Sequence, residues 1–193
     1  MRPMSSDHQP PDSVTPARTI AGVQLTYDDL LDGARAHFRA AIRRRRVLVI
    51  VALMVAAAFA FGTWVIPSGD PDPTTGIVSG VVVLAYLCGL AGLLYLVSVP
   101  RGVRKVWRQN KVLHETMEVS WEGGRYRVSG ENVNSDMPWS YYLGWRETPT
   151  IVQLYYSPAN YQILPKRHLD AAQQGDLRRT LAEAGVEEKR GPV

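Results

Sequence analysis

Two uncharged apolar stretches constrain this chain more than any other feature. Val47–Ile66 contains 20 residues and Ile77–Val99 contains 23, and residues 67–76 lie between them. At about 1.5 Å per residue, a helix of either length crosses the roughly 30 Å hydrocarbon core of a bilayer. A cleaved signal peptide has a shorter apolar core close to the N-terminus, whereas 46 residues precede the first stretch here. We therefore predict a transmembrane hairpin of two helices.

Basic residues flank both stretches and are missing from the loop between them. The loop, PSGDPDPTTG, carries two charged residues, Asp70 and Asp72. Lys and Arg collect in the cytoplasmic segments of membrane proteins, so we predict a multi-pass inner-membrane protein with both termini cytoplasmic and residues 67–76 external. The flanking basic residues are Arg35, Arg39, Arg43, Arg44, Arg45 and Arg46 before the first stretch, and Arg101, Arg104, Lys105, Arg108 and Lys111 after the second.

The charge distribution favours a membrane surface over nucleic acid as the partner. The formal net charge is +4, yet 11 of the 22 basic residues are those beside the apolar stretches. In residues 112–193, nine basic residues stand against eleven acidic ones. Anionic headgroups attract basic clusters at about 1 kcal/mol per residue. We predict the lipid bilayer as partner and anionic headgroup contacts at Arg43, Arg44, Arg45 and Arg46, with a purely topological role for these arginines as an equal alternative.

Small residues recur in both stretches at spacings that let helix backbones approach closely. They are Ala52, Ala56, Ala60, Gly76, Gly80, Ala85, Gly89 and Gly92. Packing of the hairpin on itself is the favoured explanation, and a homodimer through the second helix is the alternative. Neither stretch contains Asp, Glu, Lys, Arg or His, which disfavours a channel or transporter subunit.

The segment before the hairpin predicts a tail, a strand and a helix. Residues 1–18 are rich in Pro, Ser and Asp and are expected to be disordered. Residues 19–46 are predicted to form a strand, which can join a C-terminal sheet, and an amphipathic basic helix that begins with a capping box at Thr26 and Asp29. This helix either lies on the membrane surface or packs on the C-terminal domain. No Gly or Pro interrupts residues 34–47, so we expect it to continue into the first span.

After the hairpin, Pro100 and Gly102 mark the predicted end of the second span, and residues 100–113 are expected to form a basic juxtamembrane linker, in which Arg104–His114 is either a short basic helix or linker. Within residues 114–185 apolar residues then alternate in short segments separated by turn residues, which predicts an antiparallel sheet or partly open barrel. The expected strands are Glu115–Trp121, Arg125–Ser129, a strand around Met137–Tyr142, Gly144–Thr148, Ile151–Tyr156 and Tyr161–Leu164.

A closing helix follows the strands. Asp170 and Gln173 fit a capping box, and Gly185 is a suitable C-terminal stop. Residues 186–193 are expected to fray. The fold class is therefore an α+β membrane protein, with a two-helix transmembrane hairpin and a small cytoplasmic β domain closed by a C-terminal helix.

Motifs that carry chemistry are missing from the sequence. The four histidines are scattered, and no C-x-x-C, phosphate loop, dinucleotide fingerprint or G-x-S-x-G elbow occurs, so we predict no catalytic residue, cofactor or metal. Lys166 and Arg167 stand close to a helix N-terminus that favours anions, and they are candidate headgroup contacts, although an ordinary solvated turn explains them as well. The aromatic-rich domain also makes Trp121, Trp139 and Trp145 candidates for binding a protein partner, against core packing as the plainer explanation.

Several short motifs carry a family resemblance. They are Trp139-Ser140-Tyr141, Glu147-Thr148, Ile163-Leu164-Pro165-Lys166-Arg167 and the upstream V-x-L-T-x-x-D segment Val23–Asp29. Together with the two-span hairpin, they make residues 20–185 resemble the YcxB-like family of bacterial membrane proteins. The resemblance implies a β domain similar to bacterial pleckstrin-homology-like (PH-like) folds, and it supplies no active site.

These observations favour a non-enzymatic membrane protein that presents a cytoplasmic interaction module to a protein partner or to anionic lipid headgroups. A membrane-bound enzyme acting on a lipid-linked substrate is the first alternative. It requires carboxylates or His168 to converge with Lys166 and Arg167 in one pocket. A small channel or transporter subunit is the second alternative, and it requires an oligomer with a water-filled pore.

Overall fold

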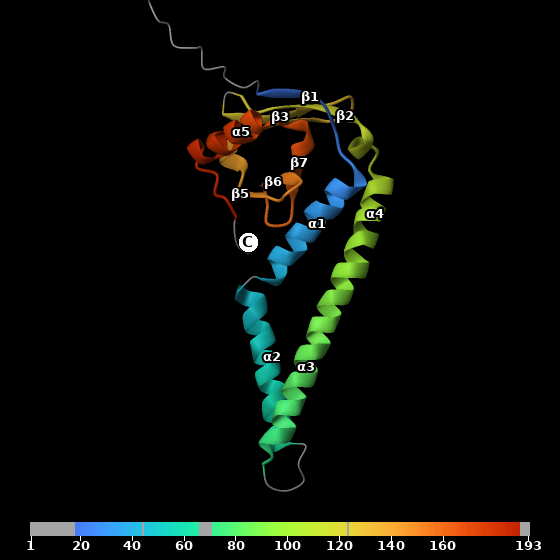
Figure 1. The fold of residues 1–193 in the computed structure, drawn as a ribbon, viewed down its shortest axis with the longest axis vertical. Coiled ribbons are helices and arrows are strands. Elements are labelled where there is room, and N and C mark those ends of the chain that lie inside the picture. The colour runs from blue at the N-terminus through green and yellow to red at the C-terminus, as the bar shows by residue number, and fades with distance from the viewer. Residues whose placement is uncertain (1–17, 44, 66–70, 123, 190–193) are drawn as a thin grey trace, which may run out of the picture.

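The computed structural model describes residues 18–43, 45–65, 71–122 and 124–189. A pair of long helices forms one end of the molecule (Figure 1). The strands and the C-terminal helix form the other end, and we call this part, the N-terminal strand Thr19–Gln24 together with residues 116–189, the module. The described chain is therefore mixed α+β with antiparallel sheets, as the sequence predicts. Outside the described residues lie Arg44, Ile66 of the predicted first span, residues 67–70 of the predicted loop, Gly123, and residues 1–17 and 190–193 of the predicted tails.

Two helices are long and apolar enough to cross a membrane. The first is α2, Arg45–Trp64. The second is an unbroken helix of 37 residues, Pro73–Gln109, which consists of α3 (Pro73–Leu93), a π-helical turn (Leu94–Ser98) and α4 (Val99–Gln109). The predicted helix end at Pro100 is wrong. The π-helical turn just before Pro100 widens the backbone, which accommodates a proline ring inside a helix.

The hairpin packs on itself through small residues near its loop, as predicted. Gly76 and Gly80 are buried, and a Cβ added to Gly76 would lie 2.9 Å from the carbonyl oxygen of Phe59 on α2. Gly89 and Gly92 lie further along the helix, where an added Cβ meets nothing within 4 Å. The alternative of a homodimer through the second helix stays a prediction.

Helix α1, Tyr27–Ile42, begins with the predicted capping box of Thr26 and Asp29. It ends at Arg43, so the expectation of one continuous helix into the first span is wrong. The two helices have different packing partners, because α1 packs against α4, β6 and β7, whereas α2 packs mainly against α3. Of the two alternatives for α1, packing on the C-terminal domain is the one observed.

The strands form two antiparallel sheets. The first has the order β1 (Thr19–Gln24), β2 (Thr116–Ser120), β3 (Arg125–Ser129), β4 (Asn134–Pro138), so the N-terminal strand does join the C-terminal sheet. The second has the order β5 (Gly144–Glu147), β6 (Ile151–Tyr155), β7 (Tyr161–Pro165). The strand expected around 137–142 lies earlier, because Trp139–Tyr141 form a 3-10 turn.

Helix α5, Ala171–Glu183, has the predicted capping box at Asp170 and Gln173, and the chain leaves it through Gly185 at a φ of +70°. Its Leu177 and Leu181 pack into a core that both sheets share. The expectation that residues from 186 onward fray is wrong for 186–189. Val186 is buried, and backbone hydrogen bonds join Glu187 and Lys189 to Trp145 on β5.

Candidate functional site

Helix α1 is attached to the module by a row of polar contacts along one face. Arg167 donates to both carboxylate oxygens of Asp29 at 2.6 and 2.9 Å. One turn further, the Gln153 side-chain amide donates to the Gly33 carbonyl oxygen at 3.0 Å, and Arg146 donates to the Ala36 carbonyl oxygen at 3.1 Å. Residues 29, 33 and 36 recur at helical spacing, so a single face of α1 is held against the second sheet.

The candidate anion contacts Lys166 and Arg167 are both engaged inside the protein. Burial alone raises the pKa of the Asp29 carboxyl, but hydrogen bonds from Arg167 and Thr26 outweigh burial, and the pKa is lowered. Lys166 lies 2.6 Å from Glu147. Arg178 binds the same carboxylate and, together with Lys166, lowers the pKa of Glu147 to about 2. These cations thus have carboxylate partners, which removes the reason to expect a headgroup there.

The same cations line a shallow hollow between α1 and the β5–β6 and β7–α5 connections. Its other lining residues are Thr26, Asp28, Asp29, Asp32, Pro149, Thr150 and Gln174. Carboxylates and cations do converge here, as the enzyme alternative requires, but Lys166 and Arg167 are held in ion pairs. His168 is not among the lining residues. Within the described part of the chain, no group of His, Cys, Asp and Glu side chains could hold a metal ion.

The three tryptophans chosen as partner contacts are core residues. Trp121 is 0% exposed, Trp139 4% and Trp145 6%. They belong to the core that the two sheets and α5 share, so these side chains offer no surface to a partner. The exposed large apolar residues of the module are instead Tyr141, Leu143 and Tyr156. A protein partner stays a prediction.

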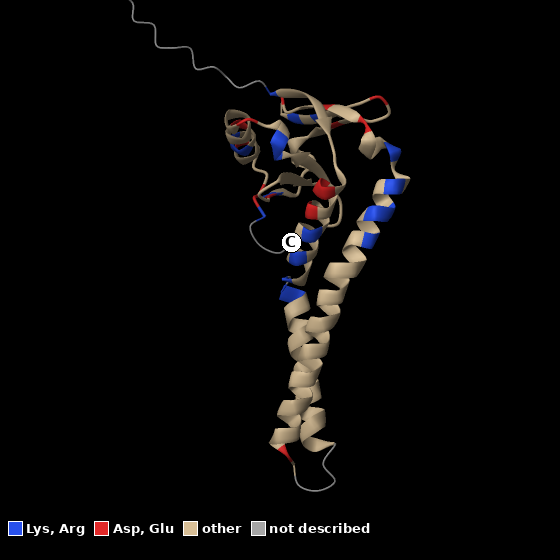
Figure 2. Ribbon diagram, turned by 45° about the vertical axis from the view of Figure 1, so that its right-hand side comes forward, with Lys and Arg blue, Asp and Glu red and all other residues tan. Residues whose placement is uncertain are grey.

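Basic residues are concentrated on the ribbon around the start of α2 and along α4, toward the module end of the two apolar helices (Figure 2). We call the following residues the basic belt: Arg43, Arg45, Arg46, Arg101, Arg104, Lys105 and Arg108. All of them are exposed, and none forms an ion pair with a carboxylate among the described residues. They come from two segments far apart in the sequence, the junction of α1 with α2 and the helix α4. Arg43 follows α1, Arg45 and Arg46 begin α2, and Arg44 lies outside the described residues, while headgroup contact by these arginines stays a prediction.

An apolar cavity of about 800 Å³ lies between α1, α4, the first sheet and β7. Leu30, Ala34, Phe38 and Ala41 line it from α1, on a different face from the one that binds the second sheet. Ser98, Val99, Gly102, Val103 and Val106 line it from the long helix opposite. Leu113, Met117, Val128 and Ile163 complete its apolar wall.

This cavity was not predicted from the sequence, although the sequence contains a signal for it. Val99, Val103 and Val106 stand at helical spacing among arginines and lysines, which is the pattern of an amphipathic helix with one apolar face. Because residues 100–113 were expected to be a linker, this apolar face had no assigned partner. In the structure Val103 is 8% exposed and packs with Leu25, Leu30 and Met117.

The comparisons with known proteins concern the module. Residues 121–181 match the family model described as YcxB-like protein, which confirms the predicted family for this segment. The match runs from the buried Trp121 to Leu181 on α5 and leaves out both apolar helices. No curated protein and no solved structure matches the chain.

Proposed function

We propose that this protein with a YcxB-like domain is a non-enzymatic, two-span inner-membrane protein that holds its module against the cytoplasmic leaflet by binding anionic lipid headgroups. The basic belt carries this proposal. Its cations come from two separate segments and are exposed, and Figure 2 shows their ribbon positions toward the module end of the apolar helices. Cations at that end of the helices meet the negative surface of the cytoplasmic leaflet, which attracts each by about 1 kcal/mol.

The apolar helices support the membrane placement. Only 11% and 6% of their most apolar windows are buried within the protein, so nearly all of their side chains would otherwise lie in water. Monomeric soluble proteins rarely expose contiguous apolar surface of this extent. The belt adjoins the module end of both helices, and the loop end carries Asp72, so the positive-inside rule places both termini in the cytoplasm.

Labelling of single cysteines tests the topology. Cys88 is the one cysteine of the chain, so Cys88→Ser gives a cysteine-free background. In intact cells, a membrane-impermeant maleimide should label Thr74→Cys at the loop end and should label Arg108→Cys in the belt only after permeabilisation. The reverse pattern would overturn the orientation.

Headgroup binding is tested with the full chain in nanodiscs that contain phosphatidylglycerol and phosphatidylcholine. Native mass spectrometry of the released protein should show retained phosphatidylglycerol in excess. The triple variant Arg45→Gln, Arg46→Gln, Arg104→Gln should lose that excess. The control Arg125→Gln, Arg127→Gln changes arginines that pair with Asp136 on the module and should keep it. Equal retention of the two lipids by the unmodified protein would refute headgroup binding.

A further inference from the structure

We infer that the apolar cavity binds one acyl chain of a lipid from the cytoplasmic leaflet, with Arg35 meeting an anionic headgroup. This inference rests on the membrane placement proposed above, but a different observation carries it. The residues of the basic belt are exposed on the surface, whereas the cavity lies between α1, α4 and the module.

The dimensions of the cavity fit an acyl chain. Its volume of about 800 Å³ is within the roughly 300–1,000 Å³ range of small-molecule sites. Its lining extends along the long helix from Ser98 to Asn110, which at about 1.5 Å per residue is about 18 Å. One leaflet contributes half of the roughly 30 Å hydrocarbon core, so a chain that fills its leaflet also fills the cavity.

The chemistry of the lining selects an apolar occupant. Val, Leu, Ile, Met, Phe and Ala side chains form most of the wall, and its polar members are His37, Ser98, Asn110, Tyr126, Ser135, Tyr161 and Gln162. Apolar cavities are poor sites for water, whereas each buried methylene contributes about 0.8 kcal/mol. A polar peptide does not match this wall, and residues 1–17 of the chain itself are rich in Pro, Ser and Asp.

The position of the cavity points to the bilayer as the source of the chain. Ser98 and Val99 belong to the cytoplasmic end of the second apolar stretch, and Ala41 lies at the end of α1 beside the basic belt. These residues line the end of the cavity nearest to the apolar helices. An acyl chain can therefore pass from the leaflet into the cavity between α1 and the long helix, with its headgroup left at the level of the belt.

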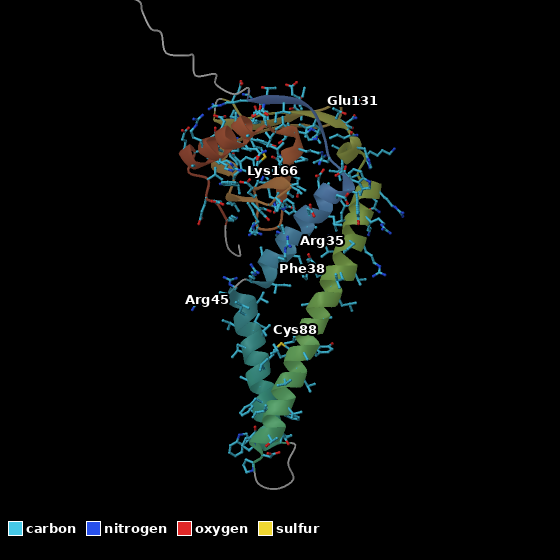
Figure 3. All side chains as sticks on the ribbon, in the orientation of Figure 1. Arg35, Phe38, Arg45, Cys88, Glu131 and Lys166 are labelled. Carbon is cyan, nitrogen blue, oxygen red and sulfur yellow. The ribbon has the colours of Figure 1, made fainter. Side chains whose placement is uncertain are left out.

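Arg35 is placed to meet that headgroup. It lies on α1 beside the cavity-lining Ala34 and Phe38, on the side toward the long helix (Figure 3). Its guanidinium lies 5.9 Å from the ring centroid of Tyr95, and Phe38 contacts the same ring. The Arg35 Nε is buried and has no hydrogen-bond partner among the described residues. A phosphate oxygen would supply the missing acceptor.

A photoreactive lipid tests the inference on the full chain. The probe is phosphatidylglycerol whose hexadecanoyl chain carries a diazirine at its terminal carbon, placed in nanodiscs with the protein. A chain that stays in the bilayer brings the diazirine to the membrane centre, where it labels α2 and α3. We expect additional labelling of Leu113, Met117 and Ile163, which lie in the cavity on the module side. Labelling confined to α2 and α3 would overturn the inference while leaving the membrane placement intact, and failure to label α2 and α3 would overturn the placement itself.

Two glycines of the long helix provide a matched pair of variants. Gly102 lines the cavity and Gly89 does not, yet a Cβ added at either meets nothing within 4 Å. Gly102→Trp should reduce labelling of the cavity residues about tenfold, which corresponds to about 1.4 kcal/mol. Gly89→Trp should leave it unchanged, and both variants should keep labelling in α2 and α3. Equal cavity labelling in the two variants would contradict the assignment.

A separate experiment tests the contact between Arg35 and the lipid headgroup. Arg35→Gln should remove the preference of cavity labelling for phosphatidylglycerol over the matching phosphatidylcholine probe, and labelling by the phosphatidylcholine probe should persist. If the preference survives in Arg35→Gln, Arg35 is not the headgroup contact. The triple belt variant described above should keep the cavity labelling, which separates the two sites.

Discussion

The variant Asp176→Asn should destabilise the module through a buried three-donor site. The Asp176 side chain is 1% exposed and accepts hydrogen bonds from Trp121 at 3.0 Å, Arg18 at 2.9 Å and Arg179 at 2.5 Å. Trp121 is itself 0% exposed. This carboxylate therefore ties α5 to the first sheet and to Arg18, which the sequence assigned to a disordered tail.

The size of the effect follows from the pKa. Burial raises the pKa of Asp176, but hydrogen bonds from Arg18, Trp121 and Arg179 outweigh it and lower the pKa from 3.8 to about 2. At 1.36 kcal/mol per pKa unit, this shift corresponds to about 2 kcal/mol of folding free energy at neutral pH. Solvent screens Arg18 and Arg179, whose side chains are 31% and 59% exposed, and this reduces the figure. The amide group of Asn adds to the loss of stability, because it turns a donor toward the other donors and so offsets the reduction by screening. We expect about 2 kcal/mol in total.

The sign of the pH dependence gives a second test. A lowered pKa stabilises the fold above the unfolded-state value near 4, and this contribution disappears as the pH falls to about 2. Urea unfolding of the full chain in detergent, followed by tryptophan fluorescence, should therefore show a deficit at pH 7 that shrinks below pH 4. The control Asp136→Asn alters an exposed pair with Arg125 and should have a much smaller effect. A pH-independent deficit, or equal deficits for the two variants, would refute the reasoning.

Two further predictions concern α1 and the glycines of the module. Arg167→Gln should raise the pKa of Asp29 toward its ordinary value and speed hydrogen exchange in α1, because it removes a bidentate pair to a carboxylate that is 6% exposed. The control Arg127→Gln should leave hydrogen exchange in α1 unchanged. Unchanged exchange in Arg167→Gln as well would count against this role. Gly175→Ala should raise the free energy of unfolding by about 0.5–1 kcal/mol, because an added Cβ meets nothing within 4 Å there. Gly33→Ala should not raise it, because the added Cβ would lie 3.0 Å from Ile163. Equal gains of the two variants in urea unfolding would contradict the close packing of α1 on β7.

Local patterns in the sequence predicted the elements well and their surroundings poorly. Alternation placed Trp121 and Trp145 in strands, but a period of two does not say how many faces of a sheet are covered. The pairing of Arg167 with Asp29 joins residues 138 positions apart, and no local pattern contains it. Pro100 was interpreted by the local rule that proline ends a helix, and a π-helical turn overrides that rule here. The cavity was missed for the same reason, since it exists only when α1 and α4 face each other.

The two connections between the apolar helices and the module differ in stiffness. Pro73–Gln109 passes from one to the other as a single helix, whereas the other connection breaks between Ile42 and Arg45. Hydrogen bonds to Asp29, Gly33 and Ala36 fix α1 to Arg167 and to the second sheet. Ala41, in the last turn of α1, lines the cavity close to the start of α2. An acyl chain between α1 and α4 would therefore contact the last turn of α1.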